Sequence, residues 1–306
     1  MVRPKIGLSR CFLKNVRYNG GSVNDDFIEK LKPYVDYIDF CPEVDIGLTV
    51  PRLRIIIKEV GNEKRLVQTE TSKDLTEAMN KYIEEVIKSL GEVDGFILKS
   101  KSPSCGVGSA KIYKNDKVIG RGDGFFASAV KRTFPYLPVE DENRLKDKEI
   151  RKHFLTKIFA FSELRALITS NPSIKKLIEF HTKYKYLLMT YNQKNLKELG
   201  RIVADAQIGL EEKLSKYKIV FYQSFLKKPS SKKHFNTILH ILGHISKELT
   251  KEEKKHLIDS VEKYKKGLLD LETIFELLKY LSIRFKNQYL LIQKYLSPYP
   301  EELERK

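Results

Sequence analysis

The sequence pattern changes near residue 142, and this change restricts the possible folds more than any other feature. Before it, apolar runs such as Lys5–Cys11 and Gly95–Lys99 alternate with stretches of helical periodicity such as Thr71–Leu90. Such alternation is typical of an α/β domain with a mainly parallel sheet. After it, only helical periodicity continues. We therefore predict an α/β N-terminal domain over residues 1–142 and an all-α C-terminal domain over residues 143–306.

Shorter signals add detail to both domains. In the first, we expect strands at 37–41 and 136–139, an antiparallel pair at 54–58 and 65–68, a hairpin around 115–116, and a helix capped by Asp123. In the second, we expect helices over 150–169, 174–191, 196–216, 234–248, 251–264 and 271–295.

The charge of the chain is distributed unevenly. Residues 1–150 carry 26 Lys and Arg against 23 Asp and Glu, a net charge of +3, whereas residues 151–306 carry 31 against 17, a net charge of +14. A surplus of positive charge in one half of a chain indicates that this half binds a polyanion. The alternative is a lysine-rich, solvated surface with no such partner. No apolar run approaches the roughly 20 residues that span a membrane, and no signal peptide is visible, so we expect a cytoplasmic protein.

The chain has three cysteines, Cys11, Cys41 and Cys105, an odd number that argues against a disulfide framework. Each one follows a predicted strand. Ligands bind at the carboxyl ends of strands in an open α/β sheet, so the three thiols should meet at one edge. Three thiolates there would hold an iron–sulfur cluster or zinc, although three unrelated cysteines would fit the spacing too. With no fourth cysteine, one iron of a four-iron cluster would be open to substrate.

Residues beside the cysteines could supply chemistry. Glu43 lies two residues after Cys41, and Lys101, Ser102 and Ser104 come just before Cys105. A carboxylate can move protons, while hydroxyls and an ammonium group can stabilise developing negative charge. A loop salt bridge, turn serines and a solvated lysine are the structural alternatives. We predict that Glu43, Ser102, Ser104 and Lys101 are catalytic.

Three segments carry a resemblance to a known family. SRCFLKNVRYNGG (9–21), FCPEVDIGLTVPR (40–52) and KSKSPSCGVGSAKIY (99–113) resemble the thiouracil desulfurase (TudS) family over about residues 3–140. The resemblance implies a [4Fe–4S] cluster on Cys11, Cys41 and Cys105, whose fourth iron takes the sulfur of a thiolated pyrimidine without net redox change. It also implies that Glu43 and Ser102 lie near the substrate. The family pattern is not matched at Asp45-Ile46-Gly47 or at GRGDG (120–124).

The second half carries a resemblance of its own. His181–Met189 and Leu199–Ala204 resemble the YbgA-type helical domain, over about residues 145–260. The fusion is similar to RudS-type tRNA 4-thiouridine desulfidases, which implies conversion of 4-thiouridine in tRNA to uridine with release of hydrosulfide. The candidate RNA contacts are Lys183, Lys185, Arg201, Lys227, Lys228, Lys232 and Lys233, with Tyr184 and Tyr186 as stacking or core residues.

Two other functions stay open. The enzyme could act on free thiouracil or thio-UMP, with the helical domain used for dimerisation. The chain could instead be a nucleic-acid-binding protein whose cluster is only structural, although a structural cluster would be expected to have every iron ligated. Turnover of intact thiolated tRNA distinguishes the three.

Overall fold

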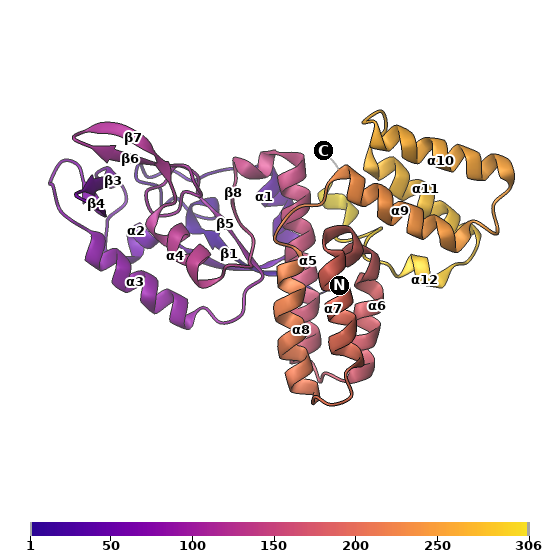
Figure 1. Ribbon diagram of the computed structural model, residues 1–306. Helices are drawn as coiled ribbons and strands as arrows, with labels where there is room; N and C mark the ends of the chain where they lie inside the picture. Colours follow the sequence, from indigo (N-terminus) through magenta and orange to yellow (C-terminus); the bar gives the residue numbers. More distant parts are fainter. Residues whose placement is uncertain (1, 305–306) are drawn as a thin grey trace. The chain divides into compact units, whose positions relative to one another are not determined.

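A computed structural model describes residues 2–304 and divides them into two compact units (Figure 1). The first unit contains residues up to Glu163 together with the final turn from Glu302, and the second contains Leu164–Glu301. The first has α/β architecture and the second is mostly helical, which confirms the predicted fold class. The dividing point lies inside helix α5 (Lys148–Thr169).

The first unit contains sheet A, whose four strands are all parallel. Their order is β2 (Asp36–Phe40), β1 (Lys5–Ser9), β5 (Gly95–Leu98) and β8 (Val139–Asp141). The expected last strand at 136–139 is thus displaced toward the C-terminus, and it begins after Pro138 because proline has no N–H to donate. All four strands end at the same edge of the sheet.

A second sheet, sheet B, is mixed. Its order is β4 (Glu63–Gln68), β3 (Ile55–Val60), β6 (Ala110–Lys114) and β7 (Lys117–Gly122). The two antiparallel hairpins were predicted. Parallel pairing of β3 with β6, which places Ile57 beside Ile112, joins them into one sheet and was not predicted.

Helices cover the inner faces of both sheets. Helix α3 (Thr76–Ser89) and helix α4 (Phe125–Thr133) pack on a shared core that contains Ile57 of sheet B and Phe96 of sheet A. Gly7 makes room for the Phe96 ring, because a Cβ at Gly7 would lie 2.3 Å from it. The other face of sheet A meets helix α5, whose Ile158 side chain would lie 2.9 Å from a Cβ at Gly95. The remaining elements of this unit are short, namely η1 (Arg10–Phe12), α1 (Asp26–Leu31), η2 (Lys32–Tyr34), α2 (Pro42–Asp45), η3 (Arg144–Lys146) and η4 (Glu301–Leu303).

The second unit contains the end of α5 and seven further helices among the described residues. They are α6 (Ile174–Tyr191), α7 (Gln193–Ala204), α8 (Leu210–Ser224), α9 (Ser231–Ile245), α10 (Lys251–Lys265), α11 (Leu271–Arg284) and α12 (Gln288–Leu291). Its core is rich in aromatic rings, such as Phe180 stacked on Tyr184 at 4.4 Å. No helix among residues 2–304 has the length and apolar character needed to cross a membrane.

Two of the predicted helices are in fact broken. The helix expected over 196–216 is split between α7 and α8, because Asp205 turns back to accept the N–H of Gln207 and Gly209 forms the N-cap of α8. The helix expected over 271–295 stops at Arg284, since Lys286 adopts a left-handed conformation with φ of 50°.

Candidate functional site

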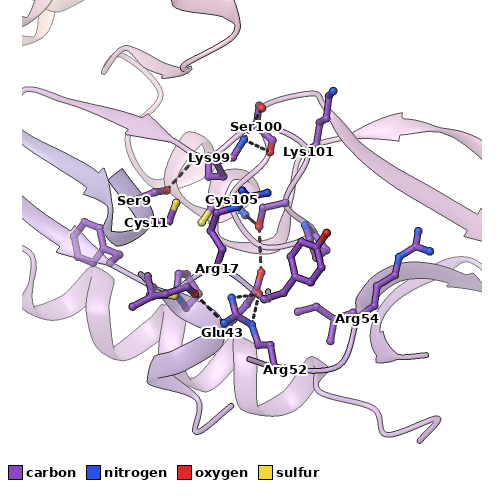
Figure 2. Close-up of a pocket in the computed structure, with 18 residues that line it drawn as sticks. Ser9, Cys11, Arg17, Glu43, Arg52, Arg54, Lys99, Ser100, Lys101 and Cys105 are labelled. Atoms are coloured by element: carbon purple, nitrogen blue, oxygen red, sulfur yellow. Dashed lines mark hydrogen bonds and ion pairs between the residues drawn. The ribbon is translucent and has the colours of Figure 1, made fainter. Parts of the chain in front are cut away.

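The three cysteines line one cavity at the carboxyl edge of sheet A. Cys11 lies in η1 directly after β1, Cys41 directly follows β2, and Cys105 lies in the turn after β5. All three are free and buried, and they border a cavity of about 520 Å³. Figure 2 shows the sulfur atoms of Cys11 and Cys105 side by side. The position of each cysteine just after a strand of the parallel sheet therefore does bring the three thiols to one edge, as expected.

The chemistry of these thiols suits a positively charged metal group. Burial raises the pKa of all three, to about 12 for Cys11, and neighbouring cysteines raise the pKa of Cys11 and Cys105 further. Iron or zinc would stabilise the thiolates that burial disfavours. Among residues 2–304, no three His, Cys, Asp or Glu side chains could hold a single metal ion. Three buried thiols on one cavity are a donor set of the kind that iron–sulfur clusters take.

Glu43 joins the cysteine turn through two serine hydroxyls. It lies in the short helix α2 and is 8% exposed. Ser102 Oγ and Ser104 Oγ both donate to Glu43 Oε1, at 3.2 and 3.1 Å. Ser102 Oγ also accepts the backbone N–H groups of Ser104 and Cys105, each at 3.1 Å. The hydroxyl of Ser102 thereby fixes the turn that presents the Cys105 thiol and links it to the carboxylate.

Arg52 holds the other oxygen of Glu43. Its Nε and Nη2 donate to Glu43 Oε2 at 2.7 and 2.6 Å, and its Nη1 donates to the carbonyl of Val16 at 2.9 Å. The two charged side chains are only 5% and 10% exposed. Sequence reasoning missed this residue, although it ends the segment FCPEVDIGLTVPR. The burial of Glu43, which requires a cation nearby, is seen only in the fold, so the sequence carried no local signal for this residue.

Known proteins resemble the two units separately. Residues 6–142 match the family model described as 2-thiouracil desulfurase. The N-terminal domain belongs to the 2-thiouracil desulfurase family. Residues 185–300 match a family described only as a protein of unknown function, DUF1722. The chain is therefore a fusion of a desulfurase-family domain with a DUF1722 domain.

Two individual proteins are similar to parts of the chain. An uncharacterised protein of Escherichia coli (strain K12), YbgA, is 24% identical over 150 residues, which are 48% of this chain and 88% of that protein. A solved structure of a [4Fe-4S]-dependent thiouracil desulfidase, TudS, is 29% identical and covers 47% of this chain and 95% of its own, with a TM-score of 0.38. Similarity to YbgA agrees with the resemblance found in the second half.

The desulfurase-family domain has a second ion pair at this cavity, between half-buried Lys99 and buried Glu142. Lys99 Nζ donates to Glu142 Oε1 at 2.5 Å and to Ser100 Oγ at 3.0 Å, and Ser100 Oγ donates to Glu142 at 2.6 Å. Burial raises the pKa of Glu142, but the hydrogen bonds from Lys99 and Ser100 outweigh it and lower that pKa. The positive charge of Lys99 also acts to lower the pKa of Cys11. Sequence reasoning assigned Lys99 to the end of a strand and gave it no role.

Lys101 is arranged differently from the other predicted catalytic residues. Its backbone has φ of 61°, and its N–H donates to Ser109 Oγ at 2.9 Å. The side chain is exposed and points away from the cysteines in Figure 2, although it still borders the cavity. Asp123 is not the N-cap of α4, which is Gly124; its carboxylate instead accepts from the Gly108 N–H and from Lys131. The N-cap prediction for Asp123 was therefore wrong.

The predicted RNA contacts of the DUF1722 domain are mostly on the surface. Lys183, Arg201, Lys227, Lys228, Lys232 and Lys233 are exposed. Lys185 is half-buried, and its ammonium group lies 6.0 Å from the centre of the Tyr289 ring. Tyr184 and Tyr186 are each 1% exposed, so they are core residues and cannot stack on a base.

Proposed function

We propose that this chain removes sulfur from thiolated uracil, and that its substrate is 4-thiouridine in tRNA, which it converts to uridine with release of hydrosulfide. The observation that carries the proposal is the cavity where three buried thiols face a carboxylate held by two serines and an arginine. Membership of the N-terminal domain in the 2-thiouracil desulfurase family supports it.

Cys11, Cys41 and Cys105 would hold a [4Fe–4S] cluster. When bound, the cluster would supply a thiophilic Lewis acid for the thiocarbonyl group of the substrate. The chain itself contributes three buried thiols that border one cavity, and these are the only cysteines in its sequence.

Glu43 is the group placed to move a proton. Its Oε1 accepts from the two serine hydroxyls and its Oε2 from Arg52, so the carboxylate is fixed in orientation. In the proposed reaction it takes a proton from water as the oxygen adds to the ring carbon. Ser102, which borders the cavity, can then stabilise the negative charge that develops on the base as water adds. Ser104 is fully buried outside the cavity lining, and its hydroxyl acts on the carboxyl group of Glu43. The carbon–oxygen bond forms and the carbon–sulfur bond breaks. The sulfur leaves as hydrosulfide with one of the two water protons, the other proton passes to solvent, and no oxidation state changes.

A tRNA substrate is favoured by the charge of the second half. Residues 151–306 carry the net charge of +14, and six of the seven candidate contacts are exposed. Phosphate contacts of this kind make affinity fall steeply with salt. The thiolated base would leave its stack to reach the cavity, which costs a few kcal/mol.

The Glu43→Gln variant tests the assigned role of the carboxylate. The protein is reconstituted anaerobically with iron and sulfide and given 4-thiouridine in tRNA, thio-UMP and free 4-thiouracil, while sulfide release is followed. We expect Glu43→Gln to lose at least about 100-fold in turnover and to keep its iron content, because the variant retains the cysteines but lacks the base.

The Cys105→Ala variant is the matched comparison and should lose both iron and turnover. Full activity of Glu43→Gln would refute its role. Sulfur loss only from the small molecules would show that tRNA is not the substrate, and sulfur loss from none of them, with the cluster intact, would refute desulfuration.

A further inference from the structure

We propose that the N-terminal domain itself binds RNA, through the outer face of sheet B and the adjoining mouth of the cavity. This inference rests on the proposed tRNA substrate and adds a binding surface that lies outside the helical domain. On this surface the strand on either side of the target nucleotide would be held while the base enters the cavity.

Two arginine–tyrosine pairs stand at the mouth. The guanidinium group of Arg17 lies 5.9 Å from the centre of the Tyr18 ring, and Arg17 and Tyr18 both border the cavity. Arg54 also borders the cavity; its guanidinium lies 5.5 Å from the Tyr113 ring centre, and its Nη2 donates to the Tyr113 hydroxyl at 2.5 Å. Tyr18 is 53% exposed. Tyr113 is half-buried. An exposed tyrosine beside an arginine can stack on an unpaired base while the cation meets a phosphate.

The register of sheet B continues this surface away from the cavity. Ile57 and Ile112 are neighbours on the inner face, which α3 covers. Side chains alternate along a strand, so Tyr113 and Lys111 of β6 are on the outer face. Arg121 of β7 is directly opposite Lys111 and shares that face.

Two cations on the outer face, Lys111 and Arg121, are available to a ligand. Lys111 and Arg121 are exposed, and no carboxylate among residues 2–304 is paired with either. Arg54 has Tyr113 as its partner rather than an acid. Lys58 lies beside Tyr113 and Arg65 lies beside Lys58 in the ladder, so cations continue across all four strands of sheet B. Lys58 and Arg65 do have carboxylate partners, Asp116 for Lys58 and Glu63 and Asp74 for Arg65. A row of cations interleaved with an aromatic ring fits a polynucleotide better than an acidic protein, which offers no bases to stack.

The test is the double variant Lys111→Glu/Arg121→Glu of the full chain. Its control is Lys81→Glu/Lys88→Glu, which makes the same change of charge at exposed positions on α3, at the opposite side of sheet B. Binding of unmodified tRNA is measured by fluorescence anisotropy over a range of salt concentrations, and turnover is measured with thiolated tRNA and with free 4-thiouracil.

We expect the outer-face variant to bind tRNA at least about tenfold more weakly. The slope of the logarithm of the binding constant against the logarithm of salt concentration should fall in magnitude by about 1.5 to 2, because each lost cation removes one phosphate contact. The loss in turnover should be confined to tRNA, and the control should match the wild type. An unchanged affinity and slope, or an equal loss on the free base, would overturn the inference. Because tRNA binding needs no turnover, the inference is tested even if the wild-type protein releases no sulfide, a result that would count against the proposed function alone.

Discussion

Replacing Arg52 should reveal how strongly the site depends on its buried ion pair. Arg52 is 5% exposed in its side chain and donates two hydrogen bonds to Glu43 Oε2 and one to the Val16 carbonyl. An Arg52→Met variant keeps most of the apolar stem but leaves the Glu43 carboxylate buried without its cation. Breaking a buried pair on one side costs about 3 to 5 kcal/mol in free energy of unfolding.

The double-mutant cycle with Glu43→Gln separates this cost from simple loss of packing. In Arg52→Met/Glu43→Gln no charge is stranded, and the carbonyl oxygen of the introduced amide can still accept from the two serines. We expect the second substitution to recover about 2 kcal/mol or more of the loss caused by the first. Arg52→Lys, which retains the charge but not the fork of donors, should lie between the wild type and Arg52→Met.

Hydrogen exchange as a function of urea suits this measurement, because peptides from residues 2–163 report on the first unit separately from the second. Peptides of the helical unit serve as the internal control and should not change. A loss below about 1 kcal/mol in Arg52→Met, or a double variant as unstable as the sum of the two single variants, would refute the reasoning that the pair is buried and coupled.

Two further predictions concern a buried lysine and a close backbone contact. Burial lowers the pKa of Lys157 from 10.5 to about 8, so its charged form destabilises the fold below pH 8 and this penalty is relieved as the pH rises toward 10.5. In urea unfolding, Lys157→Met should therefore have a free energy of unfolding above that of the wild type by up to about 3 kcal/mol at about pH 7, and by much less at about pH 10. An equal gain at the two pH values would contradict this prediction. At Gly124, a Cβ would lie 2.5 Å from the carbonyl carbon of Ser104, so Gly124→Ala should lose about 1 to 3 kcal/mol and reduce turnover by displacing the turn before Cys105. Gly120→Ala is its control, since nothing lies within 4 Å there, and comparable losses in both would show that the contact is not the cause.

The sequence was enough to predict that the cysteines meet at one edge of the sheet. It was not enough to predict the ion pair of Glu43 or the pairing of the strands of sheet B. Parallel strands end at one edge, so local strand signals before Cys11, Cys41 and Cys105 were enough to bring the thiols together. The pairing of Glu43 with Arg52 depends on the path of the loop between these two residues. The joining of the two hairpins into sheet B depends on the pairing of β3 with β6, two strands that are far apart in the sequence. Contacts of this kind leave no periodic signal in the sequence.

The distribution of charge around the cavity argues for the two parts of the proposed substrate. Near the cysteines the cations have carboxylate partners, with Arg52 paired to Glu43, Lys99 to Glu142, and Arg10 to Asp39 and Asp45. At the mouth, Arg17, Arg54 and Lys101 have no carboxylate partner within residues 2–304. A base without net charge requires no unpaired cation inside the cavity. The phosphates attached to that base are negatively charged, and they are best met by unpaired cations at the mouth of the cavity. Free thiouracil would make no use of the outer cations, so this arrangement favours a substrate that carries phosphate on both sides of the thiolated base.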